Sequence, residues 1–221
     1  GAGAGILKDI DKMEMLTREM VKRTKLPVTV KTRLGWDEKS IKIVEVAERI
    51  QDAGAKAITI HGRTRAQMYK GFADWAPISD VKNNPRMNIP VFGNGDVNTP
   101  EKAVEMRDKY GLDGAMIGRA SIGNPWFFNH VKHYFKTAEH LPFPMINERI
   151  DMARRHLEMS IEWKGEKLGV LETRRHYSNY FKGIPDFKKH RTKMVTCDYS
   201  AQLFDLFDEL KVRFKNMELA Y

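Results

Sequence analysis

The sequence contains a single cysteine, Cys197, among 221 residues. One cysteine cannot form an intramolecular disulfide, and it excludes a cysteine-rich zinc site. No apolar run approaches the roughly 18 residues that a membrane-spanning helix needs, and no basic stretch followed by an apolar run marks a signal peptide at the start. We therefore expect a protein of the reducing cytoplasm, with no metal site and no membrane partner.

Basic residues outnumber acidic ones, 38 to 29, which gives a formal net charge of +9. A basic protein of this size is attracted to polyanions, because neutralising phosphates releases counterions. On total charge alone, a merely solubilising surface is an equally good interpretation. The distribution is more informative, since seven Lys or Arg side chains lie between Arg174 and Lys193, against Asp186 as the one acidic residue.

Strand-like and helix-like segments alternate through the first 120 residues. The helical periodicity is clearest at Ile43, Val44, Ala47 and Ile50, and Thr99 is placed to cap a later helix that has Pro100 in its first turn. The predicted strands are residues 28–33, 57–61, 89–93 and 114–118. Strands that alternate with helices predict a parallel sheet with right-handed crossovers, and hence the α/β class.

The pattern changes after Trp126. Pro142 and Pro144 bracket a predicted linker, and only helical periodicity follows from Asn147 to the end. We therefore predict a β/α part over residues 1–141 and an all-helical part over residues 145–221. A closed β/α barrel needs about eight strands, so the four predicted strands would form only part of one.

Polar residues stand at or just beyond the carboxyl end of every predicted strand. In a β/α barrel this is the face that carries the active site. Gly95 and Gly118 would let the backbone approach a bound group, and Arg119 would add a charge-assisted fork to a phosphate. The polar sets are Lys31–Arg33, His61–Arg65, Asn94–Asp96 and Gly118–Arg119. Charged residues also mark where a strand leaves the core, but four strands with the same pattern favour a binding site.

The order of these motifs resembles that of the bacterial tRNA-dihydrouridine synthases. The resemblance rests on Lys31-Thr-Arg33-Leu-Gly-Trp36, His61-Gly-Arg63-Thr-Arg65, Gly93-Asn94-Gly95-Asp96 and Gly118-Arg119-Ala120, and Gly123-Asn-Pro-Trp126 and Arg174-Arg175-His176 also fit. It implies an FMN-binding (β/α)8 TIM barrel followed by a small helical tRNA-binding domain. It also implies reduction of the C5=C6 bond of uridine in tRNA, with NADPH as the electron donor. The chain would then carry the last four β/α units of that barrel.

The resemblance also implies roles for particular residues. The FMN contacts would be Lys31, His61, Asn94, Gly95, Asp96, Gly118 and Arg119, and the RNA contacts Arg63, Arg65, Arg174, Arg175, His176 and Lys182. Arg63 and Arg65 could equally reach the cofactor phosphate, and Tyr177 and Tyr180 could stack on nucleotides or belong to the helical core. The acid of the family is a cysteine that would precede Gly1, so no catalytic residue is assigned, and Cys197 is expected to be a small semi-buried residue.

These expectations have consequences for the isolated chain. We expect it to bind FMN weakly or not at all and to be inactive, and we expect a second copy or rearranged segments to cover its half-barrel face. Two other functions stay open at this stage. One is a β/α-barrel lyase or isomerase that holds a phosphorylated metabolite at Gly118 and Arg119, and the other is an RNA-binding module formed by the helical tail.

Overall fold

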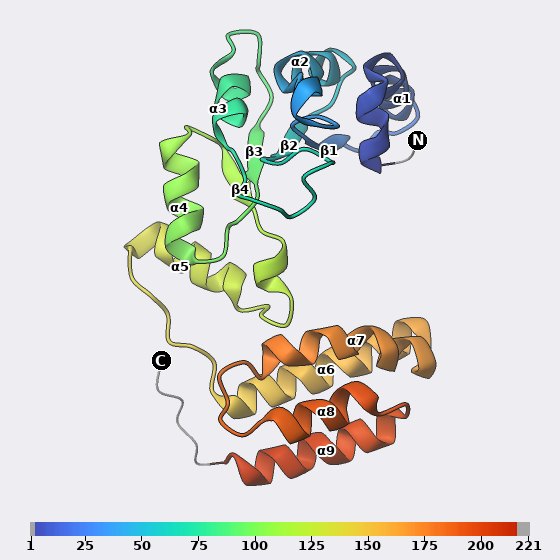
Figure 1. Cartoon of the computed structure of the whole chain (residues 1–221), viewed down its shortest axis with the longest axis vertical. Coiled ribbons are helices and arrows are strands. Elements are labelled where there is room, and N and C mark those ends of the chain that lie inside the picture. The colour runs from blue at the N-terminus through green and yellow to red at the C-terminus, as the bar shows by residue number, and fades with distance from the viewer. Residues whose placement is uncertain (1–2, 216–221) are drawn as a thin grey trace. The chain divides into compact units, whose positions relative to one another are not determined.

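The computed structural model of the chain describes residues 3–215, which form two compact units (Figure 1). The β/α unit comprises the residues up to 120 together with 131–139. The helical unit comprises residues 121–130 together with those from 140 onward. Where the domains of the whole protein begin and end stays a prediction.

The β/α unit contains a parallel sheet whose four strands follow the order of the chain, β1-β2-β3-β4. The strands are β1 (Thr29–Arg33), β2 (Ala57–His61), β3 (Val91–Asn94) and β4 (Gly114–Met116). The helices are α1 (Ile10–Lys22), α2 (Ile43–Asp52), α3 (Ala76–Asn83), α4 (Pro100–Lys109) and α5 (Phe127–Thr137), of which α5 is shared between the units. The predicted α/β class and parallel sheet are confirmed.

One face of this sheet is covered by helices. Each crossover leads to the next strand in the same direction, so right-handed connections place α2, α3 and α4 on one side. Ile58, Ile60 and Val91 are fully buried on this side, whereas Thr59, His61, Phe92 and Asn94 point to the other side. Behind β3, a Cβ at Gly93 would lie 2.0 Å from the ring of the buried Trp75, so only glycine fits there.

The helical unit is a bundle of α6 (Ile146–Lys164), α7 (Glu166–Tyr180), α8 (Lys188–Thr196) and α9 (Ser200–Arg213). The longest pair, α6 and α7, forms a hairpin that turns at Gly165, whose φ of +78° suits a residue without a side chain. Leu157, Tyr177 and Phe207 are among the side chains of its apolar core. None of the helices within residues 3–215 is long and apolar enough to cross a membrane.

A short segment of the helical unit is fixed by a close backbone approach. Gly123 has a φ of +62°, and a Cβ there would lie 2.5 Å from the carbonyl oxygen of His176. Trp126 meets Tyr180 edge-on, with ring centroids 6.2 Å apart. The motif that begins at Gly123 therefore packs directly against α7.

Candidate functional site

The carboxyl ends of the four strands meet in one row. The register pairs Arg33 with His61, His61 with Asn94, and Asn94 with Met116. Residues in register on parallel strands point to the same face, and Lys31, two residues before Arg33, shares it. The structure thus brings Lys31, His61 and Asn94 together on the sheet face opposite the buried Ile58 and Ile60.

His61 is buried in this row without a hydrogen-bond partner for one ring nitrogen. The residue is 6% exposed, and no described atom bonds its Nδ1. Burial lowers its pKa to about 4, helped by the charges of Arg33, Lys31 and Arg63 and opposed by Asp96. A buried polar atom without a partner costs free energy. Neutral His61 is therefore well suited to make one hydrogen bond to a ligand.

Lys31 and Arg33 bring positive charge to the same face. Partial burial, together with the nearby charge of Arg33, lowers the pKa of Lys31. Two like charges so close together, beside a neutral histidine, create a positive potential that favours an anionic or electron-rich ligand.

The turn after β3 is held in a conformation that few residues adopt. Gly95 and Asp96 have φ values of +122° and +56°, and a Cβ at Gly95 would lie 2.6 Å from that of Ala73. The Asp96 carboxylate accepts hydrogen bonds from both terminal nitrogens of Arg63, at 2.9 and 2.8 Å, and from the Ala73 N–H at 2.7 Å. Burial alone would raise the pKa of Asp96, but these bonds and the charges of Arg63 and Arg119 lower it.

Arg119 and Gly118 lie at the end of β4. Arg119 is exposed, donates to Asp96 at 3.2 Å, and stacks over the ring of Tyr69 at 4.6 Å from the centroid. A Cβ at Gly118 would meet no atom within 4 Å, so protein packing does not demand a glycine there. Asn94 ties the same strand end to β3, because its Nδ2 donates to the carbonyl of Met116 at 2.8 Å. Open space beside an arginine suits a phosphate that approaches the backbone.

The two arginines that follow β2 differ in exposure. Arg65 is exposed and lies over the ring of Trp36, on which Lys8 also stacks. Arg63 is buried, and Nε, Nη1 and Nη2 all donate within the protein. In this structure Arg63 is therefore not at the surface where an RNA contact would be expected.

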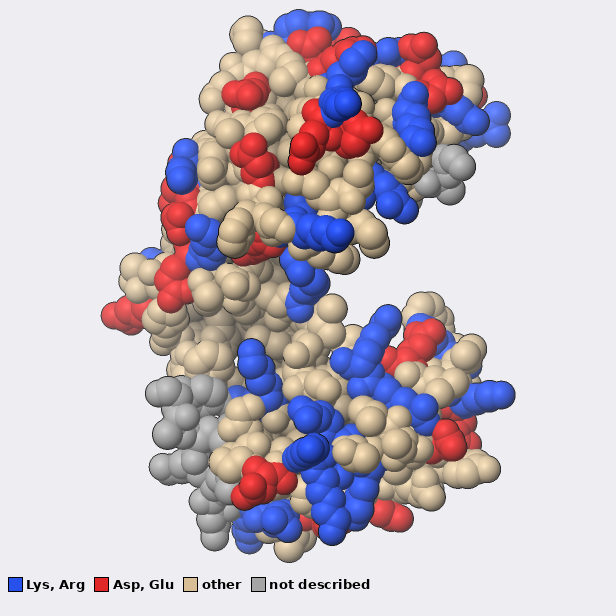
Figure 2. Space-filling view, viewed as in Figure 1, with Lys and Arg blue, Asp and Glu red and all other residues tan. Residues whose placement is uncertain are grey.

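Positive charge also gathers on the surface of the helical unit (Figure 2). Of the predicted RNA contacts, Arg175 and Lys182 are exposed and His176 is half-buried. Arg174 instead holds the end of α8, since its Nη2 donates to the Cys197 carbonyl at 2.6 Å and to Asp198 at 2.7 Å. Further exposed cations on and around α8 are Lys188, Lys189, Arg191 and Lys193.

A cluster of two histidines and a tyrosine joins α6 to α7. The rings of His156 and His176 have centroids 4.6 Å apart, and Nδ1 of His156 lies 3.2 Å from the hydroxyl of Tyr180. Burial, His156 and Arg175 together lower the pKa of His176 to about 4. Sequence reasoning missed His156, because no motif marks it. Tyr177 and Tyr180 are both buried, so of the two interpretations left open the structure favours the helical core.

Comparison with known proteins gives a consistent match. The chain matches the model of the family described as Dihydrouridine synthase (Dus) over residues 1–214. It belongs to the dihydrouridine synthase family. It is 39% identical to "Probable tRNA-dihydrouridine synthase 1" of Synechocystis sp. over 95% of this chain and 58% of that protein.

Two further relatives agree with this assignment. "Probable tRNA-dihydrouridine synthase" of Rickettsia conorii is 38% identical over 86% of this chain and 57% of its own length. "tRNA-dihydrouridine synthase B" of Pseudomonas putida is 37% identical over 87% of this chain and 56% of its own length. The chain thus spans less than two thirds of the curated dihydrouridine synthases that it matches.

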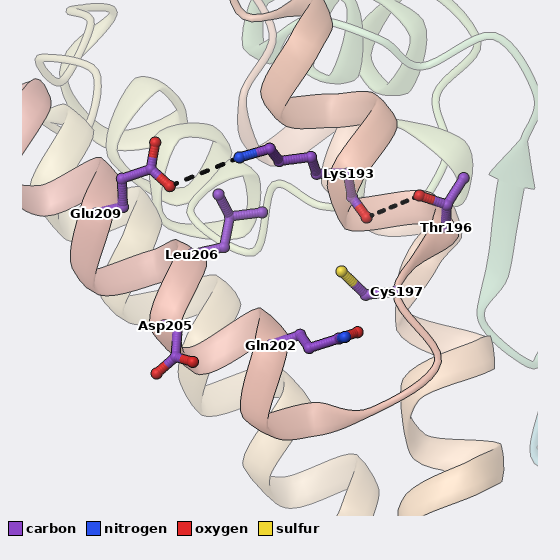
Figure 3. Close-up of a pocket in the computed structure, with 7 residues that line it drawn as sticks. All are labelled: Lys193, Thr196, Cys197, Gln202, Asp205, Leu206 and Glu209. Carbon is purple, nitrogen blue, oxygen red and sulfur yellow. Dashed lines mark hydrogen bonds and ion pairs between the residues drawn. The ribbon is translucent and has the colours of Figure 1, made fainter.

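The sole cysteine of the chain, Cys197, borders a pocket of about 410 Å³ between α8 and α9 (Figure 3). An ion pair between Lys193 and Glu209 closes one side of it. Burial and the Asp198 charge raise the pKa of the Cys197 thiol, against the effect of Arg174 and Lys193. The other lining residues are Thr196, Gln202, Asp205 and Leu206. A protonated thiol is a poor nucleophile, and none of the predicted site residues lines this pocket.

Metal ligands do not gather in the described part of the chain. Within residues 3–215, no group of three or more His, Cys, Asp and Glu side chains is placed to hold an ion.

Proposed function

We propose that the whole protein is a flavin-dependent tRNA-dihydrouridine synthase, which reduces the C5=C6 bond of uridine in tRNA with electrons from NADPH. The observation that carries the proposal is the row of Arg33, His61 and Asn94 at the carboxyl ends of parallel strands, with a buried His61 nitrogen that lacks a partner. Family membership supports this function and does not favour a lyase or isomerase.

We assign the binding of FMN to Lys31, His61, Asn94, Gly95, Asp96, Gly118 and Arg119. FMN, when bound, supplies the hydride chemistry, and the protein binds and orients it. Lys31 contributes positive charge to the sheet face, and neutral His61 contributes one hydrogen bond. Arg119 supplies the charge for a phosphate beside the open backbone at Gly118. Asp96 would support the FMN site indirectly, because its carboxylate accepts hydrogen bonds from Arg63 and from the Ala73 N–H.

We assign the binding of tRNA mainly to the basic surface of the helical unit. Arg175 and Lys182 are exposed there, and the cations of α8 enlarge the same positive surface. Lys and Arg contacts to phosphates supply affinity without reading sequence. A uridine inside folded RNA has to be turned out before chemistry reaches it. We also propose that RNA is contacted by Arg65, Arg174 and His176. A cytoplasmic location is part of the same proposal.

We also propose that the four strands are the last four of a TIM barrel. The sheet face opposite Ile58 and Ile60 supports this, because it carries Lys31, His61 and Asn94 at the strand ends, which are polar groups suited to a barrel interior with a ligand, beside Thr59, Phe92 and Met116. Self-association through this face, which carries both polar and apolar side chains, remains a prediction.

The test uses the protein produced from its complete gene. We expect it to be purified with a flavin absorption spectrum. Incubation with NADPH and an unmodified tRNA transcript should add the mass of two hydrogen atoms to particular uridines, detected by mass spectrometry. A colourless protein, or a transcript of unchanged mass in the presence of added FMN, would contradict the proposal.

The site assignment is tested by replacing His61 with Ala in the same protein. The variant should lose flavin and activity together, because the buried ring is the proposed contact. The matched control is His133→Gln, a histidine of the β/α unit that lies outside the strand-end row. Equal flavin content in the His61 and His133 variants would remove His61 from the site.

A further inference from the structure

The side chain of Arg63 connects two segments that are far apart in the sequence. Only 2% of the residue is exposed. Its Nε donates to the carbonyl of Lys70 at 3.1 Å and its Nη2 to that of Gly71 at 2.6 Å. Its two terminal nitrogens also grip the Asp96 carboxylate as a fork, at 2.9 and 2.8 Å. One guanidinium thus holds both the loop after β2 and the turn after β3.

The loop after β2, residues 62–75, depends on arginine donors for its backbone. Its carbonyls at Thr64 and Met68 accept from Arg33 at 2.8 and 3.1 Å, as those at Lys70 and Gly71 accept from Arg63. Met68 has a φ of +52° and Gly71 one of +62°, so the loop follows neither helix nor strand geometry. Irregular backbone needs partners outside regular structure. Arg33 and Arg63 each supply two such partners to this loop.

The turn after β3 depends on the same guanidinium. Asp96 has a φ of +56°, which is unfavourable for a residue with a side chain unless its surroundings hold it there. Its carboxylate also accepts the Ala73 N–H at 2.7 Å and Arg119 Nη2 at 3.2 Å. Trp75 Nε1 donates to the carbonyl of Gly95 at 3.1 Å. The ends of β2, β3 and β4 are therefore joined through Asp96 and Arg63.

We infer that Arg63 is a positioning residue that locks the loop after β2 and the turn after β3 into one rigid edge of the strand-end site. The inference rests on the proposed function in so far as this edge serves a flavin. Arginine is required because its planar fork reaches two carboxylate oxygens and two carbonyls at once. A lysine would place one point charge there and leave several buried acceptors without donors.

The first test is amide hydrogen exchange, measured by mass spectrometry on the full chain without flavin. In Arg63→Lys, peptides covering residues 64–73 and 95–98 should both exchange about tenfold faster or more, because both segments lose hydrogen bonds to a charged group. The helical unit should keep its rates. Faster exchange in only one of the two segments, or in neither, would overturn the inference.

The helical unit offers a matched control in Arg149. This arginine is also buried, and it donates to the carbonyls of Pro144 and Lys182 at 3.1 and 3.0 Å. Arg149→Lys should speed exchange in the helical unit and leave residues 64–73 and 95–98 unchanged. An increase in those two segments equal to that of Arg63→Lys would show general loosening and contradict a local lock.

The second test asks whether Arg63 acts through the hydrogen bonds of its guanidinium or merely by filling space. Arg63→Ala should regain protection in both segments when guanidinium is added at millimolar concentration, whereas methylammonium at the same concentration should have no effect. Equal rescue by both ions, or rescue of one segment alone, would overturn the inference. If the Arg63 variants do not fold, Asp96→Asn takes their place, and it must loosen residues 64–73 as well as its own turn.

These readouts need no flavin, so they are independent of the proposed function. If the chain shows the lock but the protein from the complete gene never binds flavin, the proposed function alone is contradicted. If that protein binds flavin while Arg63→Lys leaves both segments of the chain protected, the lock alone is contradicted.

Discussion

In the β/α unit, polar side chains are buried beside the strand ends, whereas in the helical unit an apolar cluster fills most of the interior, and the cations of the basic surface are exposed. Thr59, His61, Arg63 and Asn94 are all buried, while Arg175 on α7 is exposed. Burying a polar group costs free energy unless it is bonded. Exposed charge carries little such cost. In the β/α unit, burial of these polar side chains lowers the free energy of unfolding but fixes their positions. In the helical unit, the exposed cations create a positive potential with little effect on stability.

The two uses of arginine make the contrast specific. Arg63 donates only to groups of its own unit, and its neighbours Gly95 and Asp96 adopt backbone conformations that need such support. Arg175 is exposed, and its Nε donates to the ring of its neighbour His176 at 3.3 Å. A substitution at the strand ends of the β/α unit should therefore change the local geometry. A substitution on the basic surface of the helical unit should change the long-range attraction of RNA. Four variants, one of them a triple substitution, test this contrast.

The largest effect is expected for Gly93→Ala in the β/α unit. The added methyl group would lie 2.0 Å from Cζ3 of Trp75, whose side chain is fully buried. We expect a loss of about 3 kcal/mol or more in the free energy of unfolding. Urea titration followed by Trp fluorescence measures this loss. A loss below about 1 kcal/mol would show that the surrounding side chains move to make room for the added methyl group.

The next largest effect is expected for the cations of α8. Replacing Lys188, Lys189 and Arg191 by Gln should weaken tRNA binding about tenfold or more, because fewer phosphates are then neutralised. The slope of log affinity against log salt should become shallower by up to about one for each of these cations that pairs with a phosphate. The measurement is a filter-binding titration at several salt concentrations, and the stability should stay unchanged.

The control for the α8 triple variant removes the same charge from the other unit. Lys25, Lys39 and Lys56 are exposed cations of the β/α unit, and they too are replaced by Gln. An equal loss of tRNA affinity in both triple variants would mean that total charge, and not the surface of the helical unit, attracts the RNA.

A smaller effect is expected from the pH dependence of the β/α unit. Folding lowers the pKa of His61 from 6.5 to about 4, so between these values the unfolded chain binds the extra proton. The contribution of neutral His61 to the free energy of unfolding is therefore fully present above pH 6.5, and it is lost as the pH falls towards 4. Relaxation of the protein around the charged ring should limit the change to about 1 kcal/mol.

The variant that tests this dependence is His61→Gln, with His133→Gln as the control. Urea titrations at pH values between 4 and 7 should show a weaker pH dependence in the His61 variant alone. His176, whose pKa also falls to about 4, should produce the same trend in the helical unit. An identical pH profile in the natural chain and the His61 variant would contradict the burial of this ring.

Much of the fold could be predicted because its signals are local. The strand at residues 57–61 and the start of the helix at Ile43 follow from periodicity alone, and Thr99 caps α4 as its side chain predicts, by accepting the Lys102 N–H. The third strand begins at Val91 rather than at residue 89, because Pro90 has no N–H to donate to the sheet. Helix α5 was not predicted, since its aromatic residues follow a Gly-Asn-Pro turn that masks the start.

The site could be predicted only as far as the strand ends. Parallel pairing fixes that Lys31, His61 and Asn94 share a face, and the sequence pattern is enough to infer this. The bond between Arg63 and Asp96 joins residues 33 positions apart and depends on how two loops fold. The same limit applies to His156, which reaches Tyr180 through helix packing. Contacts set by irregular backbone or by helix pairing leave no periodic signal.

The smallest effect on stability is expected for Gly118→Ala. A Cβ there would meet no atom within 4 Å, so the free energy of unfolding should change by less than about 0.5 kcal/mol. Gly5→Ala is the matched control, because its Cβ would also enter open space while it lies far along the chain from the strand ends. With the protein from the complete gene, flavin fluorescence should show weaker FMN binding in the Gly118 variant alone. A methyl group that costs no stability yet weakens binding has to occupy space that a ligand uses, whereas equal FMN affinity in both variants would mean that the phosphate does not approach the backbone at Gly118.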